Sequence, residues 1–422
     1  MAPYLPGIVD PIAPLSQLTT PAARAWLGAH AHAQPAQLLL AAHRWPTLPV
    51  RALVAQLAAR QKAAAKLPTW AADPERVFPP GLSVEQASSE ATARFKARLV
   101  AGAPSLADLT GGFGVDAAHL AHTVGHVTYV EQHAALAAVV AHNTARLGPP
   151  NLTIVVTTAE AWLAQAAPDS FAWLYLDPAR RDGAGRRVAA LADCTPAVPA
   201  LLPALWRVAP RILLKTAPLL DLTAATRELG AVTEIVVVEL DGEVKEVLYL
   251  LSRAGAPRAP TRRAVLLAPD GSPAAEFAPF TPAEEEAAAV TFGPPEAFIF
   301  EPAPAVLKAG ALRLAAARYH LRKLHPNAHL YTGAAPVAGW PGRQWRVRGT
   351  CRYDRRAVAA LVPEGRASIT ARHFPADVPT IRQRLGLADG GSLTLLATTG
   401  PDNRPVLIVG ERVAADSLRQ PA

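Results

Sequence analysis

Two short stretches of this 422-residue chain carry residue types that could bind a small ligand and position a substrate. The first is Asp108-Leu-Thr-Gly-Gly-Phe-Gly-Val-Asp116, and the second is Tyr175-Leu-Asp-Pro-Ala-Arg-Arg181. Gly111, Gly112 and Gly114 allow the backbone to approach a ligand closely because they have no Cβ. An apolar strand that ends in Asp and continues into Gly-Gly-x-Gly is typical of a loop that holds a nucleotide-like ligand.

A second acidic residue follows at the offset that such a ligand requires. Glu131 ends an apolar run roughly 20 positions after Asp108, where a carboxylate can accept hydrogen bonds from ribose hydroxyls. Asp108 itself could orient the loop or accept a hydrogen bond from a ligand ammonium group. Each feature also has a simpler interpretation: a tight turn for the glycines, a solvated strand end for Glu131 and a helix cap for Asp108. Their joint spacing favours a ligand site.

The dipeptide Asp177-Pro178 is the catalytic candidate, because it ends an apolar run where a fourth strand is expected. Proline lacks an N–H and restricts the preceding residue to extended conformations, so the turn is fixed. The Asp177 carboxylate and the Pro178 carbonyl could then hold an exocyclic amine and aim its lone pair at an electrophilic methyl group. An ordinary Asp-Pro turn is the simpler interpretation. The position after the fourth strand favours the catalytic one.

Strand and helix patterns alternate from residue 105 to about residue 251, which predicts a doubly wound α/β domain. The expected strands are 105–109, 127–130, 153–156, 173–176, 211–214, 232–239 and 246–251. The expected helices include 117–122, 134–146 and 197–209. The last two strands are joined near Asp241-Gly242 and are close enough in sequence to form an antiparallel hairpin.

The remaining patterns divide the chain into four predicted segments. They are an N-terminal helical region at 1–100, the α/β domain at 101–255, a connecting α+β segment at 256–335 and a small α+β domain at 336–422. The N-terminal region shows helical spacing at 15–27, 37–42, 50–65 and 91–100. Arg94, Lys96 and Arg98 on its last helix are expected to be solvated, and the alternative is a direct contact with the substrate. The connecting segment is expected to hold a strand at 264–267 and a helix from 304 to about 324. The last domain is expected to contain strands 344–347, 367–371, 392–398 and 405–409 and helices 354–362 and 378–385.

These motifs resemble a known enzyme family. The glycine stretch, Tyr129-Val-Glu131-Gln132 and the Asp-Pro stretch look like motifs one, two and four of class I S-adenosylmethionine-dependent methyltransferases. More narrowly, they resemble a bacterial family with an Asp-Pro-Ala-Arg-Arg motif and a C-terminal THUMP-like domain, as do Leu213-Leu-Lys-Thr-Ala-Pro218 and Gln86-Ala-Ser-Ser-Glu90. The resemblance covers most of the chain. It implies a Rossmann-like methyltransferase domain preceded by helices and followed by a small α+β domain.

The resemblance also implies S-adenosylmethionine as the cofactor. The cofactor-binding residues that follow from it are Asp108, Thr110, Gly111, Gly112, Phe113, Gly114, Glu131, Gln132, Thr158 and Glu160. The chain departs from many relatives after the third strand, where they carry an Asp that accepts from the adenine amine. Here Thr158 falls nearest that position, and Glu160 is the nearest carboxylate but could instead cap the helix at Ala161.

Several basic residues are candidates for phosphate contacts. Arg180 and Arg181 follow the catalytic turn, and guanidinium groups bind phosphate in bidentate geometry, although the alternative is a solvated loop. Lys215 could approach the pocket from the end of the fifth strand or form an ion pair with Asp221. An arginine-rich face in the last domain suits either RNA or solubility. Its substrate candidates are Arg346, Arg348 and Arg372.

Composition narrows the partner classes. Lys and Arg number 42 against 34 Asp and Glu, and the formal net charge of +8 suits a polyanionic partner without requiring one. No apolar run of about 18 residues predicts a membrane span, and the N-terminus shows no secretory signal, so a cytoplasmic protein without membrane partners is expected. The 12 His and 2 Cys lack metal-ligand spacing, so no metal is expected. The oligomeric state is not indicated.

Together these features predict an S-adenosylmethionine-dependent methyltransferase that acts on an exocyclic amine or ring nitrogen of a nucleobase in structured RNA, either tRNA or rRNA. Asp177 and Pro178 would orient a base that has been flipped or unstacked. The alternatives are a DNA amino-methyltransferase and a non-catalytic RNA-binding or assembly protein that retains the cofactor pocket. The sequence does not specify the base, the atom or the RNA.

Overall fold

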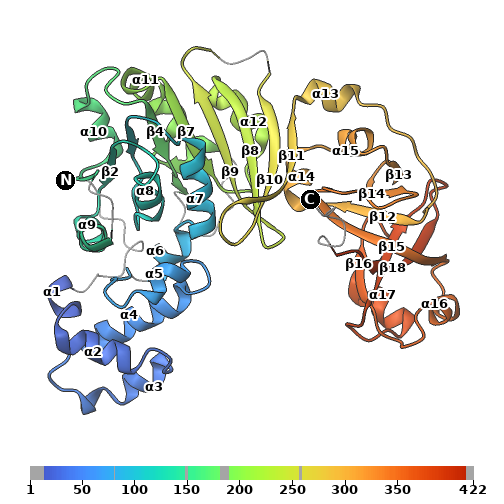
Figure 1. Ribbon diagram of the computed structural model, residues 1–422, viewed down its shortest axis with the longest axis horizontal. Coiled ribbons are helices and arrows are strands. Elements are labelled where there is room, and N and C mark those ends of the chain that lie inside the picture. Colours follow the sequence, from blue (N-terminus) through green and yellow to red (C-terminus); the bar gives the residue numbers. More distant parts are fainter. Residues whose placement is uncertain (1–13, 80, 148–150, 181–189, 256–258, 415–422) are drawn as a thin grey trace, which may run out of the picture. The chain divides into compact units, whose positions relative to one another are not determined.

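The computed structural model describes residues 14–79, 81–147, 151–180, 190–255 and 259–414 (Figure 1). The chain divides into two compact units. Unit 1 comprises Met1–Ile235, Lys245–Pro260 and Leu267–Ser272, and unit 2 comprises Val236–Val244, Thr261–Leu266 and Pro273–Ala422. The predicted segment boundaries at residues 100, 255 and 335 stay predictions. Within the described part of the chain, no helix is long and apolar enough to cross a lipid bilayer.

Unit 1 contains seven neighbouring strands of a nine-stranded sheet, in the order β8-β9-β7-β4-β1-β2-β3. Its strands are β1 (Leu106–Asp108), β2 (Val127–Glu131), β3 (Leu152–Val156), β4 (Trp173–Leu176), β7 (Arg211–Thr216), β8 (Val232–Leu240) and β9 (Glu243–Ser252), of which the last two contribute residues to both units. Strands β3, β2, β1, β4 and β7 pair in parallel, whereas β9 runs antiparallel to β7. β1 is the first strand of the sheet in sequence, and later strands are added on both sides of it. The loops after β1 and β4 therefore lie side by side at the carboxyl edge of the parallel strands. The α/β prediction is confirmed.

The helices of unit 1 begin either at a side-chain cap, as Thr20, Ser89, Thr158 and Asp221 provide, or without one, as at Val50. They are α1 (Leu15–Leu18), α2 (Pro21–Ala29), α3 (Pro35–Leu40), α4 (Val50–Ala63), α5 (Pro68–Ala72), α6 (Gly81–Gln86), α7 (Glu90–Leu99), α8 (Val115–Leu120), α9 (Ala134–Leu147), α10 (Ala159–Gln165), α11 (Val198–Val208) and α12 (Leu222–Leu229). Short strands β5 (Ala179–Arg180) and β6 (Cys194–Thr195) pair with each other. The single helix predicted at 15–27 is wrong, because Thr20 caps a new helix that starts at Pro21.

The N-terminal helices and the glycine loop share one hydrophobic core. Phe113 lies in the loop between β1 and α8 and is 3% exposed. Its ring packs edge-on against Trp70, with 5.1 Å between ring centroids, and at 5.6 Å against Phe78. Val115, Ala118 and Val139 belong to the same cluster. The loop conformation therefore depends on side chains that precede it by about 35 to 45 residues.

Unit 2 contains a seven-stranded sheet with the order β13-β14-β12-β15-β18-β17-β16. Its strands are β12 (Phe298–Pro302), β13 (Arg322–His325), β14 (Ala328–Gly333), β15 (Gly342–Cys351), β16 (Ser368–Ala371), β17 (Leu393–Thr399) and β18 (Pro405–Arg412). Its helices are α13 (Pro282–Ala287), α14 (Pro304–Ala309), α15 (Leu314–Arg318), α16 (Arg355–Leu361) and α17 (Val378–Leu385). Strands β10 (Thr261–Leu267) and β11 (Pro273–Phe280) lie largely in this unit as well.

The helix predicted from residue 304 to about residue 324 is wrong. Helix α14 ends at Gly310, which adopts the left-handed conformation with φ of 88°. After α15 the chain continues as β13, and Lys323 and His325 pair with β14. Residues 322–325 therefore lie on a strand and not at the end of the predicted helix.

We predict that Phe113→Ala lowers the free energy of unfolding by about 3–5 kcal/mol, because the substitution opens a cavity between the glycine loop and the N-terminal helices. Chemical denaturation followed by fluorescence measures this change. Phe292→Ala, at a position that is 45% exposed, is the control and should cost less than about 1 kcal/mol. Equal small losses for the two variants would contradict the shared core.

Candidate active site

The glycine loop after β1 is held by the neighbouring strand β2. Gly111 N donates to Val130 O at 3.0 Å, and the Tyr129 hydroxyl donates to Gly112 O at 2.6 Å. A Cβ on Gly111 would lie 2.2 Å from Tyr129 Cε2, so no larger residue fits unless the ring moves. Gly114 has φ of 74° and caps α8 in a conformation that other residues rarely adopt. The loop from Thr110 to Gly114, which we call the cradle, therefore requires glycine at positions 111 and 114.

Two carboxylates fix the ends of this cradle. Glu131, at the end of β2, accepts from Gly112 N at 2.9 Å through Oε2 and from His133 N at 2.8 Å through Oε1. Asp108 is 1% exposed and accepts from Thr110 N at 3.0 Å. Burial raises the pKa of Asp108 well above its usual range, and the hydrogen bond from Thr110 offsets only part of this effect. The buried Asp108 carboxyl therefore retains its proton to a higher pH than an exposed Asp does.

Asp177 lies directly beside the glycine loop, although 67 residues separate it from Thr110. Asp177 N donates to Thr110 Oγ1 at 2.6 Å, and Leu109 N donates to Tyr175 O at 3.0 Å. The Asp177 carboxylate accepts from Lys215 Nζ in an ion pair, and its side chain is 28% exposed. The two motifs that the sequence singled out are thus brought together, with the Asp177 carboxylate fixed and partly open to solvent.

The ion pair of Lys215 differs from the one considered from the sequence. Asp221 instead caps α12, where its Oδ1 accepts from Ala224 N at 2.7 Å. Burial works against the charged form of Lys215, but Asp177 and then Glu246 outweigh it and raise its pKa above the usual value. Lys215 therefore remains an ammonium ion that is committed to Asp177, which argues against a direct role in binding phosphate.

A buried cluster of charged groups lies close to this pair and was missed in the sequence. Lys96 is fully buried and donates to Glu246 Oε2 at 2.7 Å, with Asp116 Oδ1 at 3.2 Å. Asp116 Oδ2 accepts from the hydroxyls of Ser88 and Tyr175, both at 2.7 Å. The expectation that Lys96 is solvated is wrong. No local signal in the sequence marked this pairing, because Glu246 follows Glu243 and Lys245 in the charged first part of β9.

The loop after β3 shows which residue caps the following helix. Thr158 Oγ1 accepts from Ala161 N at 3.2 Å, so Thr158 is the N-cap of α10 and Glu160 is an exposed residue of its first turn. Thr157 N donates to Glu131 O at 3.1 Å and keeps this loop beside the end of β2. Gln132 is exposed just beyond that strand end. Phe113 points into the core, so a cofactor contact by its ring is not supported.

The remaining predicted residues lie elsewhere. The side chain of Arg180 and all of Arg181 fall outside the described residues. In unit 2, Arg348 pairs with Glu411 at 2.6 Å and Arg372 pairs with the buried Glu301 at 2.7 Å, whereas the guanidinium of Arg346 lies 5.2 Å from the Phe298 ring centroid. Within the described ranges, no group of three or more His, Cys, Asp and Glu side chains could hold a metal ion.

The fold and this site define a class I methyltransferase domain, and comparisons with known proteins agree. A candidate methyltransferase from Porphyromonas gingivalis W83, of known crystal structure, is 31% identical, and the match covers 96% of this chain and 100% of that one with a TM-score of 0.85. Residues 298–341 match the model of a ferredoxin-like domain, and residues 342–412 match that of a THUMP domain-like family. The chain therefore belongs to the family of the Porphyromonas protein, class I methyltransferases with a C-terminal THUMP-like domain.

More distant similarities are also found. A candidate methyltransferase from Escherichia coli is 20% identical over 39% of this chain and 84% of that one, with a TM-score of 0.28. A candidate RNA methyltransferase from Pyrococcus horikoshii is 14% identical over 43% of this chain and 86% of that one, with a TM-score of 0.27. No curated protein matches this chain.

We predict a pH-dependent effect of Asp108→Asn on stability. The folded protein holds the Asp108 proton more tightly than the unfolded chain does, so this group favours folding least at high pH. The variant should match the wild type near pH 4 and become relatively more stable as the pH rises above the ordinary Asp pKa of about 4. Denaturation between pH 4 and 8 measures the difference. Asp402→Asn, at an exposed turn, is the control. A difference independent of pH for Asp108→Asn would contradict the raised pKa.

Proposed function

We propose that this protein transfers a methyl group from S-adenosylmethionine to an exocyclic amine or ring nitrogen of a nucleobase in structured RNA, either tRNA or rRNA. The observation that carries the proposal is the position of Asp177, which is tied to the glycine loop through Thr110 and held by Lys215. A cofactor loop and an acceptor for an amine then lie within one small region.

The residues of the cradle fit S-adenosylmethionine. Gly111 and Gly112 are only partly buried, so their backbone can meet a ligand without interference from a Cβ. Each Glu131 oxygen accepts one hydrogen bond and retains a second lone pair, so the carboxylate can still accept from two ribose hydroxyls. Thr158, in the loop that follows β3, and Glu160, in the first turn of α10, are the candidates nearest the adenine. When bound, the cofactor supplies an electrophilic methyl group on a sulfonium.

Catalysis in this proposal is mainly positioning. Asp177 Oδ2 is engaged by Lys215, which leaves Oδ1 and the Pro178 carbonyl to accept from a substrate amine. The Lys215 ammonium holds the Asp177 carboxylate in one rotamer, so that its other oxygen is positioned as an acceptor. Holding the amine in one orientation keeps its lone pair aligned with the methyl group, and such alignment is a large part of the rate enhancement in two-substrate reactions. Lys215 is therefore a positioning residue.

RNA is the proposed substrate because of unit 2 and the net charge. The unit includes a THUMP-like domain, and THUMP domains in general bind RNA. Arg346 is exposed on β15 of this domain, and the chain as a whole carries a formal charge of +8. Positive charge favours a polyanion, and recognition of folded RNA relies largely on shape and phosphate contacts.

We predict that Asp177→Ala reduces methyl transfer at least about 100-fold while the Kd for S-adenosylmethionine changes less than about threefold, because Asp177 orients the acceptor. Lys215→Met should lower kcat about tenfold or more with little change in KM, since the carboxylate loses its fixed orientation. Transfer of a radioactive methyl group to RNA from cells that lack the protein, together with calorimetry, measures both effects.

Glu286→Ala, at an exposed position, is the control for a lost carboxylate and should retain full activity. Unchanged transfer by Asp177→Ala would contradict the catalytic assignment. Methyl transfer to DNA alone would favour a DNA amino-methyltransferase, and cofactor binding without any transfer would favour a non-catalytic RNA-binding protein.

A further inference from the structure

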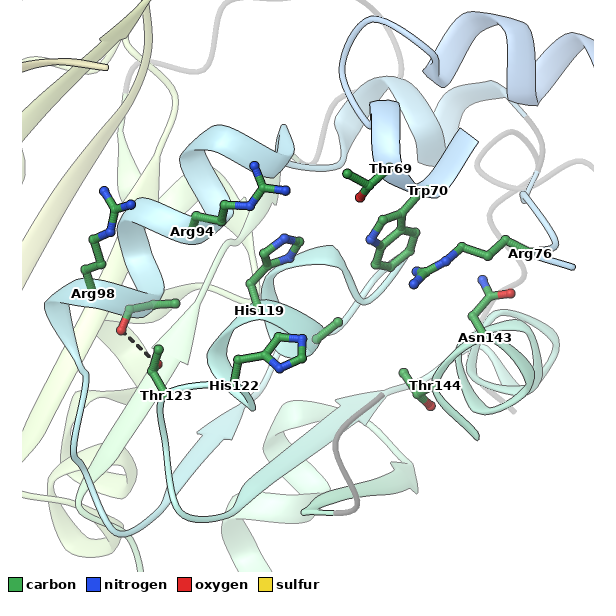
Figure 2. Close-up of a pocket in the computed structure, with 12 residues that line it drawn as sticks. Thr69, Trp70, Arg76, Arg94, Arg98, His119, His122, Thr123, Asn143 and Thr144 are labelled. Atoms are coloured by element: carbon green, nitrogen blue, oxygen red, sulfur yellow. Dashed lines mark hydrogen bonds between the residues drawn. The ribbon is translucent and has the colours of Figure 1, made fainter. Parts of the chain in front are cut away.

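A hollow in unit 1 lies apart from the residues of the proposed active site. It measures about 370 Å³ and is bordered by the segment 69–76, by α7, by the end of α8 and by α9 (Figure 2). Its charged and aromatic lining consists of Trp70, Arg76, Arg94, Arg98, His119 and His122. No Asp or Glu is among the described residues that line it, and neither Asp177 nor Lys215 contributes. We call this hollow the arginine groove.

Hydrogen bonds hold the arginines of α7 in place and leave some of their N–H groups available. Arg94 and Arg98 lie one turn apart on α7 and border the same side of the groove (Figure 2). Arg94 donates to Glu90 at 2.9 Å, and Glu90 is 1% exposed; Arg98 donates to Gly271 O at 2.6 Å. A guanidinium has five N–H donors, so these bonds fix each side chain and leave other N–H groups for a ligand.

The opposite side of the groove carries a third guanidinium. Arg76 lies 4.1 Å from the centroid of the buried Trp70 ring, which holds it flat. Its Nε is buried and makes no hydrogen bond within the described residues, and Asp73 Oδ2 lies 3.5 Å from it. Figure 2 shows His119 and His122 between this arginine and the pair on α7. The groove thus presents hydrogen-bond donors and positive charge from two sides.

We propose that the arginine groove binds backbone phosphate groups of the RNA substrate. The inference rests on the proposed function and adds a docking site that lies outside the catalytic residues. Preorganised guanidinium groups with free donors match phosphate oxygens, which accept only. Glu90 and Asp73 pair with Arg94 and Arg76 but do not line the groove, so they orient these arginines without adding a carboxylate to its lining.

The test compares two double variants with equal charge loss. Arg94→Gln with Arg98→Gln removes the pair on α7, whereas Arg51→Gln with Arg227→Gln removes two exposed arginines of the same unit that do not line the groove. The Kd for bulk bacterial tRNA is measured at several NaCl concentrations. Each lost phosphate contact should lower the slope of log Kd against log salt by about 1. We expect the groove variant to bind about tenfold more weakly than the control, with an unchanged Kd for S-adenosylmethionine.

His122→Glu provides a second variant that leaves both arginines in place. The position is exposed, and a carboxylate there should repel phosphate and weaken tRNA binding in the same way. Equal Kd values and salt slopes for all variants would overturn the groove while leaving the RNA substrate intact, whereas a wild type that binds no RNA would overturn both proposals. Binding of AMP that is lost in the groove variant, without any change in tRNA binding, would assign the groove to a free nucleotide and also overturn the inference.

Discussion

The rest of unit 1 depends on the two buried ion pairs of Lys96. The Lys96 ammonium joins α7 to Glu246 on β9 and to Asp116 on α8, and Asp116 in turn accepts from Tyr175 on β4. Burial raises the pKa of Asp116, but Lys96 and then Lys215 outweigh it and lower that pKa. Removing one member would leave uncompensated charge in the core, which typically costs about 3–5 kcal/mol. The cluster therefore fixes α7 and α8 beneath the glycine loop and Asp177.

Local patterns in the sequence predicted many of the helices and strands, but they could not predict contacts between residues that are distant in the chain. β4 and α17 have the predicted bounds because apolar spacing and flanking turn residues are local signals. The partner of Lys215, the burial of Lys96 and the direction of the Phe113 ring depend on residues far away in the chain. Gly310 ended a helix that periodicity alone would have continued, since alanines surround the break.

The arginine-rich face of the last domain contains arginines that form structural ion pairs and arginines that remain exposed. The amino-acid composition alone could not distinguish these two groups. The carboxylate of Glu301 on β12 is buried and pairs with Arg343 at 2.6 Å and with Arg372 at 2.7 Å. Glu301 belongs to the ferredoxin-like segment, and both arginines belong to the THUMP-like segment, so these ion pairs hold the two segments together within unit 2. Arg372 thus has a structural role, because it pairs with the buried Glu301. Arg346, which remains exposed, is better suited to contact RNA.

Methylation of a nucleobase in RNA can be tested by nucleoside mass spectrometry of cells with and without this gene. Total tRNA, rRNA and DNA are digested separately, and their methylated nucleosides are compared. We expect one methylated nucleoside to disappear from tRNA or rRNA and to return when the wild-type gene is restored. Unchanged RNA nucleosides, with or without a loss from DNA, would contradict it.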